Sequence, residues 1–278
     1  MDFGKSIFEN RMEKGSPFLV AHRGVCGANI PCNTLAAFKI ALDHGADVIE
    51  LDVAISKDRE YFVFHPGTEP VFLKCGRLIS EMTSDEVKAL RLLNQDEVVT
   101  SYAIPTLEEA LNFLKGRAYI NVDKFWTDVK GISEVIHRCG VENQVIAKTF
   151  TDQKSLDEVA LYAPDLMFMP LVSETDTVTD DLIAKGVNVI GAELLFKTES
   201  ADVISDEYIN KMHSRKLLLW ANSIIYNEKA VISAYHTDDI SLTDSPDKGW
   251  GWIIDKGFDF IQTDWLLPLK NYIEKRNG

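Results

Sequence analysis

Short aliphatic segments alternate with amphipathic helical segments along most of this 278-residue chain. Strands separated by helices of this length form parallel βαβ units. Eight such segments predict an α/β protein whose strands close into a (β/α)8, or TIM, barrel. An open doubly wound sheet is the alternative, but no glycine-rich dinucleotide fingerprint follows the first segment. The eight segments are residues 17–24, 47–55, 117–125, 144–150, 166–172, 187–196, 217–224 and 258–264.

Residues from about 56 to 104 interrupt this alternation. They contain a strand that ends at His65, a turn in the sequence PGTEP and one helix after SEMTSDE. We therefore expect a single domain over residues 1–278, with a small insertion between the second and third βα units. Insertions at the mouth of a barrel usually shape the substrate pocket.

A repeat of eight residues occurs four times, as GADVIELD, GRAYINVD, GVNVIGAE and GFDFIQTD. Each copy begins with a glycine that ends a helix and places an acid seven residues later. The four acids therefore share one register, toward the carboxyl ends of the strands, where active sites of this fold gather. Any single one of them is equally well explained as a solvated residue at a strand end. The acids are Asp52, Asp123, Glu193 and Asp264.

The first copy of the repeat carries a second acid, Glu50, two residues before Asp52. Alternate side chains of a strand point to the same face, so both carboxylates lie on one side. Two like charges held this close repel each other and resist burial. The pair therefore needs a cation, a shared proton or open water. A hard divalent cation, Mg²⁺ or Ca²⁺, takes oxygen ligands of this kind.

Charge and composition narrow the classes of partner. The net charge of −14 repels phosphate backbones and anionic membrane surfaces, so we expect a small-molecule substrate and no nucleic acid. The four cysteines have neither zinc-site spacing nor the density of a disulfide scaffold, and the first 18 residues have no apolar run typical of a signal peptide. No run of 18 apolar residues occurs that could form a membrane-spanning helix. We expect a cytoplasmic protein.

The chain contains, in order, His22-Arg23-Gly24, Glu50-x-Asp52 and His65 at the end of the next strand segment. This ordered set resembles the glycerophosphodiester phosphodiesterase family. That family has His-Arg-Gly, then Pro-Glu-Asn-Thr, then Glu-x-Asp, and a histidine at the end of the next strand. The sequences LWANS and GFDFIQTDWLLP are similar to its later strands, so the resemblance covers nearly the whole chain. The matching residues are His22, Arg23, Gly24, Glu50, Asp52 and His65.

The resemblance implies hydrolysis of glycerophosphodiesters to glycerol 3-phosphate and an alcohol, with a divalent cation held by carboxylates. It also implies that His22 and His65 act as general acid and base, in an order that the sequence does not assign. A histidine suits this role because its ordinary pKa lies near neutrality. Arg23 offers a planar clamp for phosphate.

Later strand ends supply further candidates for substrate contacts. We expect Lys148 to contact phosphate, Glu193 to contact a glycerol hydroxyl and Trp220 to contact the alcohol part of the substrate. Each of these three residues has an alternative reading as a core or surface residue.

Three motifs depart from the family pattern. Cys32 stands where the family has glutamate, and Pro66 follows His65 where the family has aspartate. On the third strand the family's Glu-x-Lys aligns with Asn121 and Asp123. The internal repeat instead places Asp123 opposite Asp52, so we predict that Asp123 is the third metal ligand, together with Glu50 and Asp52.

Two other functions stay open. One is a related barrel enzyme of the phospholipase D type, in which the substrate's own hydroxyl attacks the phosphate. The other is a degenerate barrel that only binds a ligand, since several family residues are missing. The alcohol released and the oligomeric state are not encoded in any motif, and we expect alcohol specificity to lie in loops such as 66–80 and 225–250.

Overall fold

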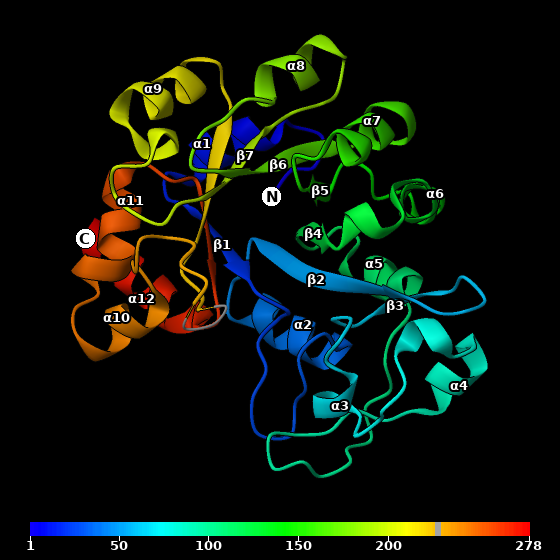
Figure 1. Cartoon of the computed structure of the whole chain (residues 1–278). Coiled ribbons are helices and arrows are strands. Elements are labelled where there is room, and N and C mark those ends of the chain that lie inside the picture. Colours follow the sequence, from blue (N-terminus) through cyan, green and yellow to red (C-terminus); the bar gives the residue numbers. More distant parts are fainter. Residues whose placement is uncertain (226–228) are drawn as a thin grey trace.

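The computed structural model describes residues 1–225 and 229–278, and its centre is a closed barrel of eight parallel strands (Figure 1). β1 pairs in parallel with both β2 and β9, which closes the barrel. All eight aliphatic segments supply a strand, so the predicted TIM barrel is confirmed. The barrel strands are β1 (Phe18–Ala21), β2 (Val48–Ile55), β4 (Tyr119–Asp123), β5 (Val145–Thr149), β6 (Met167–Ser173), β7 (Gly191–Leu195), β8 (Leu218–Asn222) and β9 (Phe260–Thr263).

Helices surround the barrel, and side-chain caps fix where several of them begin. Thr34, Thr106, Asp128, Asp152 and Ser205 each accept a hydrogen bond from a backbone N–H in the first turn of the helix that follows. The outer helices are α2 (Leu35–Asp43), α5 (Leu107–Leu114), α6 (Val129–Cys139), α7 (Gln153–Tyr162), α8 (Thr179–Ala184), α9 (Asp206–Ser214), α11 (Trp252–Lys256) and α12 (Leu266–Asn277).

Shorter elements lie in the connections. The 3-10 segments η2 (Phe125–Thr127) and η3 (Asp202–Ile204) precede α6 and α9, while α10 (Asp238–Thr243) and the π-helical segment η4 (Asp247–Gly251) precede α11. Among the described residues, no helix combines the length and the apolar character needed to cross a membrane.

The inner faces of the strands form a core of their own, separate from the core between strands and helices. Large apolar side chains fill the barrel from its amino end, where helix α1 (Ile7–Lys14) covers it and Asn10 donates a hydrogen bond to the Tyr119 hydroxyl, 2.7 Å away. Polar side chains follow only near the carboxyl ends. The inner core consists of Ile7, Phe18, Val20, Val48, Tyr119, Ile146, Met167, Met169, Leu218, Trp220 and Phe260.

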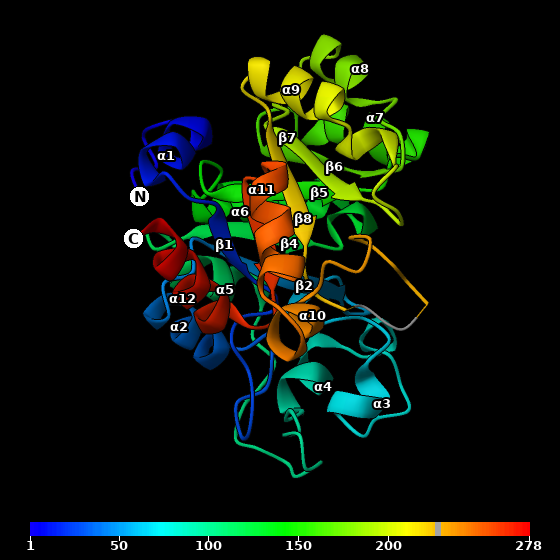
Figure 2. The same cartoon turned by 90° about the vertical axis from the view of Figure 1, so that its left-hand side faces the viewer.

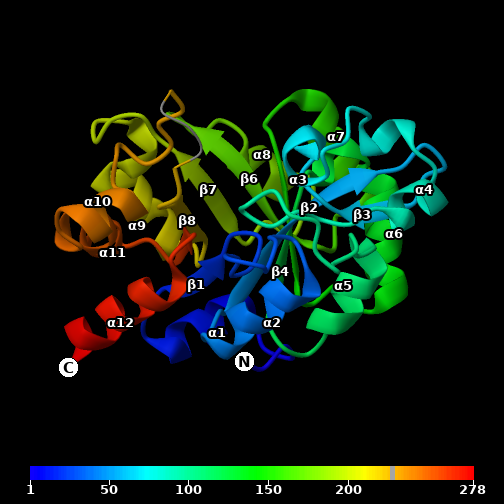
Figure 3. The same ribbon diagram turned by 90° about the horizontal axis from the view of Figure 1, so that it is seen from below.

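Between β2 and α5 the chain forms β3 (Tyr61–Val63), α3 (Glu69–Phe72), η1 (Ile79–Glu81) and α4 (Ser84–Ala89). β3 pairs antiparallel with β2, and this segment buries a small core around Phe62, Ile79 and Val87. Figures 2 and 3 show α3 and α4 at the opposite end of the barrel from α1. The fold therefore includes the expected insertion at the barrel mouth, while the division of the chain into one domain over 1–278 stays a prediction.

The four glycines that begin the repeats, Gly45, Gly116, Gly186 and Gly257, have positive φ angles of 89°, 73°, 82° and 95°. Residues other than glycine rarely adopt such backbone angles. They end the helices that precede β2, β4, β7 and β9 and so set the register of those strands. As a result Glu50 lies beside Asn121, and Asp52 lies beside Asp123. The repeat-based alignment of the third strand is confirmed as strand register.

Candidate active site

A cavity of about 300 Å³ opens at the carboxyl end of the barrel. Six of the residues singled out in the sequence line it, and Asp52 lies behind its wall with no exposed surface. Asn121, Lys124, Asn222 and Gln262 contribute further polar groups. The six residues are His22, Arg23, Glu50, His65, Asp123 and Glu193.

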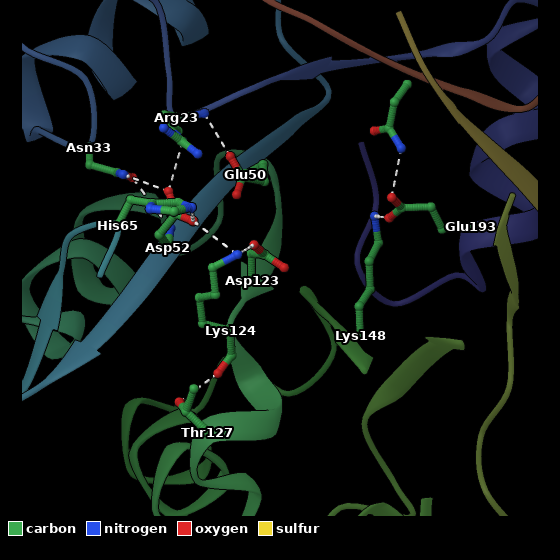
Figure 4. Close-up of polar contacts among 11 residues, drawn as sticks. Arg23, Asn33, Glu50, Asp52, His65, Asp123, Lys124, Thr127, Lys148 and Glu193 are labelled. Atoms are coloured by element: carbon green, nitrogen blue, oxygen red, sulfur yellow. Dashed lines mark hydrogen bonds and ion pairs between the residues drawn. The ribbon is translucent and has the colours of Figure 1, made fainter. Parts of the chain in front are cut away.

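Three carboxylates converge at one side of this cavity. One oxygen from each of Glu50, Asp52 and Asp123 lies within 4.8 Å of the others, and the first two residues are buried (Figure 4). Buried carboxylates at this distance repel one another strongly. The cluster therefore has the donor atoms and the spacing of a site for a hard divalent cation.

Asp52 is the centre of this cluster. Its Oδ2 accepts a hydrogen bond from Asn33 Nδ2 at 2.9 Å and lies 2.8 Å from Arg23 Nε, an ion pair without hydrogen-bond geometry. Its Oδ1 lies 3.9 Å from His65 Nε2 and 4.0 Å from Lys124 Nζ. Among the described residues, Oδ1 has no hydrogen-bond partner although it is buried. An unsatisfied buried oxygen in an acidic cluster is what a cation ligand presents before the cation binds.

The carboxyl group of Glu50 is unfavourable in its ionised form in this cluster. Burial, and then the charge of Asp52, raise the pKa of its carboxyl group to about 8. Its Oε2 accepts a hydrogen bond from the backbone N–H of Arg23 at 2.8 Å. A proton or a cation is therefore needed to stabilise this carboxylate near neutral pH.

The loop after β1 reaches the cluster through an unusual backbone. Arg23 and Asn33 have φ angles of 56° and 57°, in the left-handed region that non-glycine residues seldom occupy. Between them, Gly24 has a φ of 80°, and a Cβ atom there would lie 2.8 Å from the Ala37 backbone. The glycine of the His-Arg-Gly motif is thus required by a close contact with α2, which brings Arg23 to Asp52. Strained backbone of this kind is common at functional sites.

His22 is held by a carboxylate. Its Nδ1 lies 2.7 Å from Asp264 Oδ1, and the Asp264 backbone N–H donates to Asp238 Oδ2 at 2.9 Å. Burial opposes the charged imidazolium, but Asp264 and Glu50 outweigh it and raise the pKa of His22. Because Nδ1 is engaged, Nε2 is the atom available for proton exchange.

Asp238 is itself buried, at the first position of helix α10 between β8 and β9. Its Oδ1 accepts hydrogen bonds from Ser223, Trp250 and Thr263, at 2.6, 2.7 and 2.7 Å. Burial raises the pKa of this carboxyl group to about 6, although the hydrogen bonds favour the ionised form. The sequence offered no signal for Asp238, while the repeat had already marked Asp264.

His65 lies on the other side of Asp52. Neither of its ring nitrogens has a hydrogen-bond partner among the described residues, and both are buried. Burial lowers the pKa of its imidazole, and the charge of Asp52 offsets this only in part. The two histidines thus differ in electrostatic setting, His22 being favoured in its charged form and His65 in its neutral form.

Lys124 is a site residue that the sequence reasoning missed. Its Nζ lies 2.8 Å from Asp123 Oδ2, and a φ of 61° turns the chain sharply after β4. Burial opposes its charge, but Asp123 and Asp52 raise the pKa of the ammonium group. Asn121, by contrast, donates from Nδ2 to the Ile146 carbonyl at 3.1 Å. Asp123 and Lys124 together therefore occupy the end of the third strand.

Lys148 and Trp220 do not line the cavity. The Lys148 ammonium is buried, 2.5 Å from Glu193 Oε2 and 2.9 Å from the centre of the Trp220 ring. Asn222 Nδ2 donates to the other Glu193 oxygen at 2.7 Å. In Figure 4 the Lys148–Glu193 pair lies well apart from Asp52. The expected contacts of Lys148 with phosphate and of Trp220 with the alcohol do not match this geometry, because both side chains lie below the cavity floor.

The rim of the cavity divides into two halves. The charged half comes from the chain after β1, strand β2, the chain after β3, and the end of β4 with the residue that follows it. It consists of His22, Arg23, Glu50, His65, Asp123 and Lys124. The apolar half, formed by the chain after β4, strands β6 and β7 and the chain after β5 and β8, consists of Trp126, Phe150, Leu171, Leu195, Ile224 and Ile232. Trp126 and Phe150 form an aromatic pair whose ring centres are 4.6 Å apart.

The two loops expected to set alcohol specificity differ. Among the described residues, none from 66–80 lines this cavity, whereas Ile232 of the loop 225–250 does. Residues 226–228 of that second loop lie outside the described residues.

Comparison with known proteins gives one family model, described as a domain of unknown function, which matches residues 168–273. A curated glycerophosphodiester phosphodiesterase from Caldanaerobacter subterraneus is 33% identical over 156 residues, covering 53% of this chain and 63% of that protein. The uncharacterized protein YqiK of Bacillus subtilis is 29% identical over 204 residues, covering 70% of this chain and 82% of that protein.

Among solved structures, a glycerophosphoryl diester phosphodiesterase from Parabacteroides distasonis superposes with a TM-score of 0.77 at 24% identity. The match covers 94% of this chain and 87% of that one, and it shows that the two share a fold. The chain is therefore similar to glycerophosphodiester phosphodiesterases in the ordered motifs from His22 to His65, in its curated relatives and in its fold.

Proposed function

We propose that this protein is a metal-dependent phosphodiesterase that hydrolyses glycerophosphodiesters to glycerol 3-phosphate and an alcohol. The observation that carries the proposal is the convergence of Glu50, Asp52 and Asp123 within 4.8 Å, beside a cavity that two histidines line. The similarity to curated glycerophosphodiester phosphodiesterases supports the substrate class.

The carboxylate cluster fits Mg²⁺ or Ca²⁺. All three groups offer hard oxygen donors, and the buried, unsatisfied Oδ1 of Asp52 is the kind of atom that such an ion binds. When bound, the cation would neutralise the acidic cluster and stabilise negative charge that develops on the phosphoryl oxygens. A protein with a net charge of −14 needs such local positive charge to attract an anionic substrate.

Arg23 and Lys124 provide further positive charge on the same side of the cavity. Arg23 Nε lies 2.8 Å from Asp52, and Lys124 Nζ lies 2.8 Å from Asp123. Their positions beside the cluster suit contacts with the phosphoryl oxygens of a bound substrate. Lys124 thereby takes the role that sequence analysis had given to Lys148.

Proton transfer falls to the two histidines. One removes a proton from the attacking water and the other protonates the leaving alcohol oxygen. Asp264 keeps His22 in one orientation, with Nε2 as the exchanging atom. The raised pKa of His22 suits a proton donor and the lowered pKa of His65 suits a proton acceptor.

Glu193 is the group we assign to a glycerol hydroxyl. It lines the cavity, and Lys148 and Asn222 hold its two oxygens from below. Trp220, whose ring lies under the Lys148 ammonium, supports this pair rather than the substrate.

Turnover of glycerophosphoethanolamine, with product analysis by phosphorus NMR, tests the proposal. We expect open glycerol 3-phosphate to form with Mg²⁺ or Ca²⁺ present, and no turnover in excess chelator. Asp52→Asn should weaken ion binding without unfolding the barrel, since it relieves a repulsive pair. Full activity in chelator would refute the metal requirement, and a cyclic phosphate product would identify the phospholipase D type of reaction instead. A folded, metal-supplied protein that hydrolyses no diester would be a binding module.

A further inference from the structure

Six apolar side chains line one side of the catalytic cavity. Phe150 is 49% exposed beside Trp126, while Leu171 and Ile224 line the cavity although each is less than one tenth exposed. Apolar side chains that line a binding cavity favour an apolar part of the ligand.

A second cavity of about 280 Å³ continues this half outward. It shares Ile224 and Ile232 with the catalytic cavity, so the two spaces have a common wall. Most of its lining is aliphatic, and two of its side chains, Ile225 and Tyr235, are 46% and 66% exposed. The described lining consists of Ile224, Ile225, Ala230, Val231, Ile232, Ser233, Tyr235, Thr237, Asp239 and Ile240.

The chemistry of this second cavity excludes the phosphate and disfavours a cationic head group. Its only charged side chain among the described residues is Asp239, which repels an anion. Recognition of a quaternary ammonium uses several aromatic rings, whereas Tyr235 is the one ring in this described lining. Aliphatic walls of this kind accommodate a hydrocarbon chain.

We propose that the substrate carries a single hydrocarbon chain, which lies in the second cavity while the phosphoryl group lies at the charged half of the catalytic cavity. This inference rests on the proposed function and narrows its substrate class to amphiphilic glycerophosphodiesters. The chain can be attached to the leaving alcohol or to the glycerol, since both attachments present the same hydrocarbon chemistry.

Three matched substrates test the proposal with the full chain and saturating Mg²⁺. Glycerophosphoethanolamine has no chain, its N-octanoyl derivative carries the chain on the alcohol, and 1-octanoyl lysophosphatidylethanolamine carries it on the glycerol. We expect at least one eight-carbon substrate to have a kcat/KM at least about tenfold above that of the chain-free compound, since a single methylene in an apolar pocket already gives about tenfold or more. The preferred isomer identifies the attachment.

Val231→Asp places a charge in the wall of the second cavity, and Val231→Thr is the milder, nearly isosteric variant. We expect both to reduce the ratio of kcat/KM for the chain-bearing substrate to that for glycerophosphoethanolamine, Val231→Asp to about unity. The matched control is Leu242→Asp, because Leu242 is 41% exposed on α10 and lines neither cavity. This control should leave the preference intact.

Calorimetric binding of the same compounds separates this inference from the proposed function. Tighter binding of a chain-bearing compound without turnover of any substrate would support binding of the hydrocarbon chain in the second cavity and would overturn the hydrolytic function. If all three compounds are hydrolysed with equal kcat/KM values and bind with equal affinity, the inference about the hydrocarbon chain is overturned while the hydrolytic function stands. A loss in Val231→Thr that is equal for chain-free and chain-bearing substrates would also overturn it.

Discussion

The charged and apolar halves of the cavity rim both lie at the carboxyl end of one barrel, but they differ in what they bury. The charged half buries ionisable groups, whereas the apolar half leaves an aromatic group partly exposed to water. The charged half buries Glu50 and Asp52 almost completely and must compensate them with Arg23, Lys124 and the histidines. The apolar half leaves groups such as Phe150 partly in water. Burying charges requires partners close by, so they cluster on neighbouring strands. Under the proposed function, one barrel mouth separates the phosphoryl chemistry from recognition of the rest of the substrate.

The strongest test of this separation is the loss of one histidine. His22→Ala and His65→Ala should each lower kcat by about two to four orders of magnitude, the usual effect of removing a general acid or base. Single-turnover kinetics with saturating metal would measure the chemical step directly.

Phe150→Leu in the apolar half is the matched control for the histidine variants. Phe150 is half exposed and lies away from the carboxylates, so we expect its kcat to change far less than in either histidine variant. Normal turnover in both histidine variants would show that the two halves do not divide the work in this way.

Asp238 gives a pH-dependent test of the support beneath the charged half. Its pKa is raised from 3.8 to about 6 in the folded state, so the folded protein holds this proton more tightly than the unfolded chain. Stability from this group is therefore complete below about pH 4 and is lost as the pH rises to about 6, by up to about 3 kcal/mol for two pKa units.

Thermal unfolding of the protein and of Asp238→Asn between pH 4 and pH 6 isolates this effect. The variant loses hydrogen bonds at every pH, but it lacks the titration. We expect its deficit in Tm relative to the unaltered protein to shrink as the pH rises. A deficit that grows with pH would mean that the four hydrogen bonds to Asp238 outweigh its burial.

The smallest effect concerns the third strand. Removing a charged ligand costs more ion affinity than removing a neutral amide, so Asp123→Ala should raise the metal concentration needed for half-maximal activity by about ten- to a hundredfold. Asn121→Ala, the control one step deeper on the same face, should change it little. A metal titration of both variants decides between them, and greater sensitivity at Asn121 would restore the family's own register.

Much of this site could be predicted because it follows from local rules. Glycines at a fixed spacing end helices, and strand alternation then puts Glu50 and Asp52 on one face with Asp123 beside them. Lys124 escaped prediction because a left-handed turn after the strand redirects its side chain, which alternation does not encode. Asp238 escaped because it follows no strand and has no repeat.

Depth within the barrel was the other quantity that the sequence did not encode. Lys148 and Trp220 point inward, as alternation requires, but they lie beneath the cavity floor. Depth depends on how the strands are staggered around the barrel axis, which arises only when the sheet closes. The sequence therefore led us to expect substrate contacts for Lys148 and Trp220. In the structure Lys148 pairs with Glu193, and the Trp220 ring packs against Lys148.

Asp264 donates a backbone hydrogen bond to Asp238 and its carboxylate accepts one from His22 Nδ1, which has a consequence for how such proteins diverge. The loop that contributes Ile232 and Val231 to the second cavity continues directly into Asp238, so under the two proposals one segment serves both substrate choice and proton transfer. Residues before Asp238 can be exchanged to accept new substrates while the histidine keeps its orientation. A deletion or insertion that displaces Asp238 would disturb both at once, so descendants with new specificities should differ in side chains here more readily than in loop length.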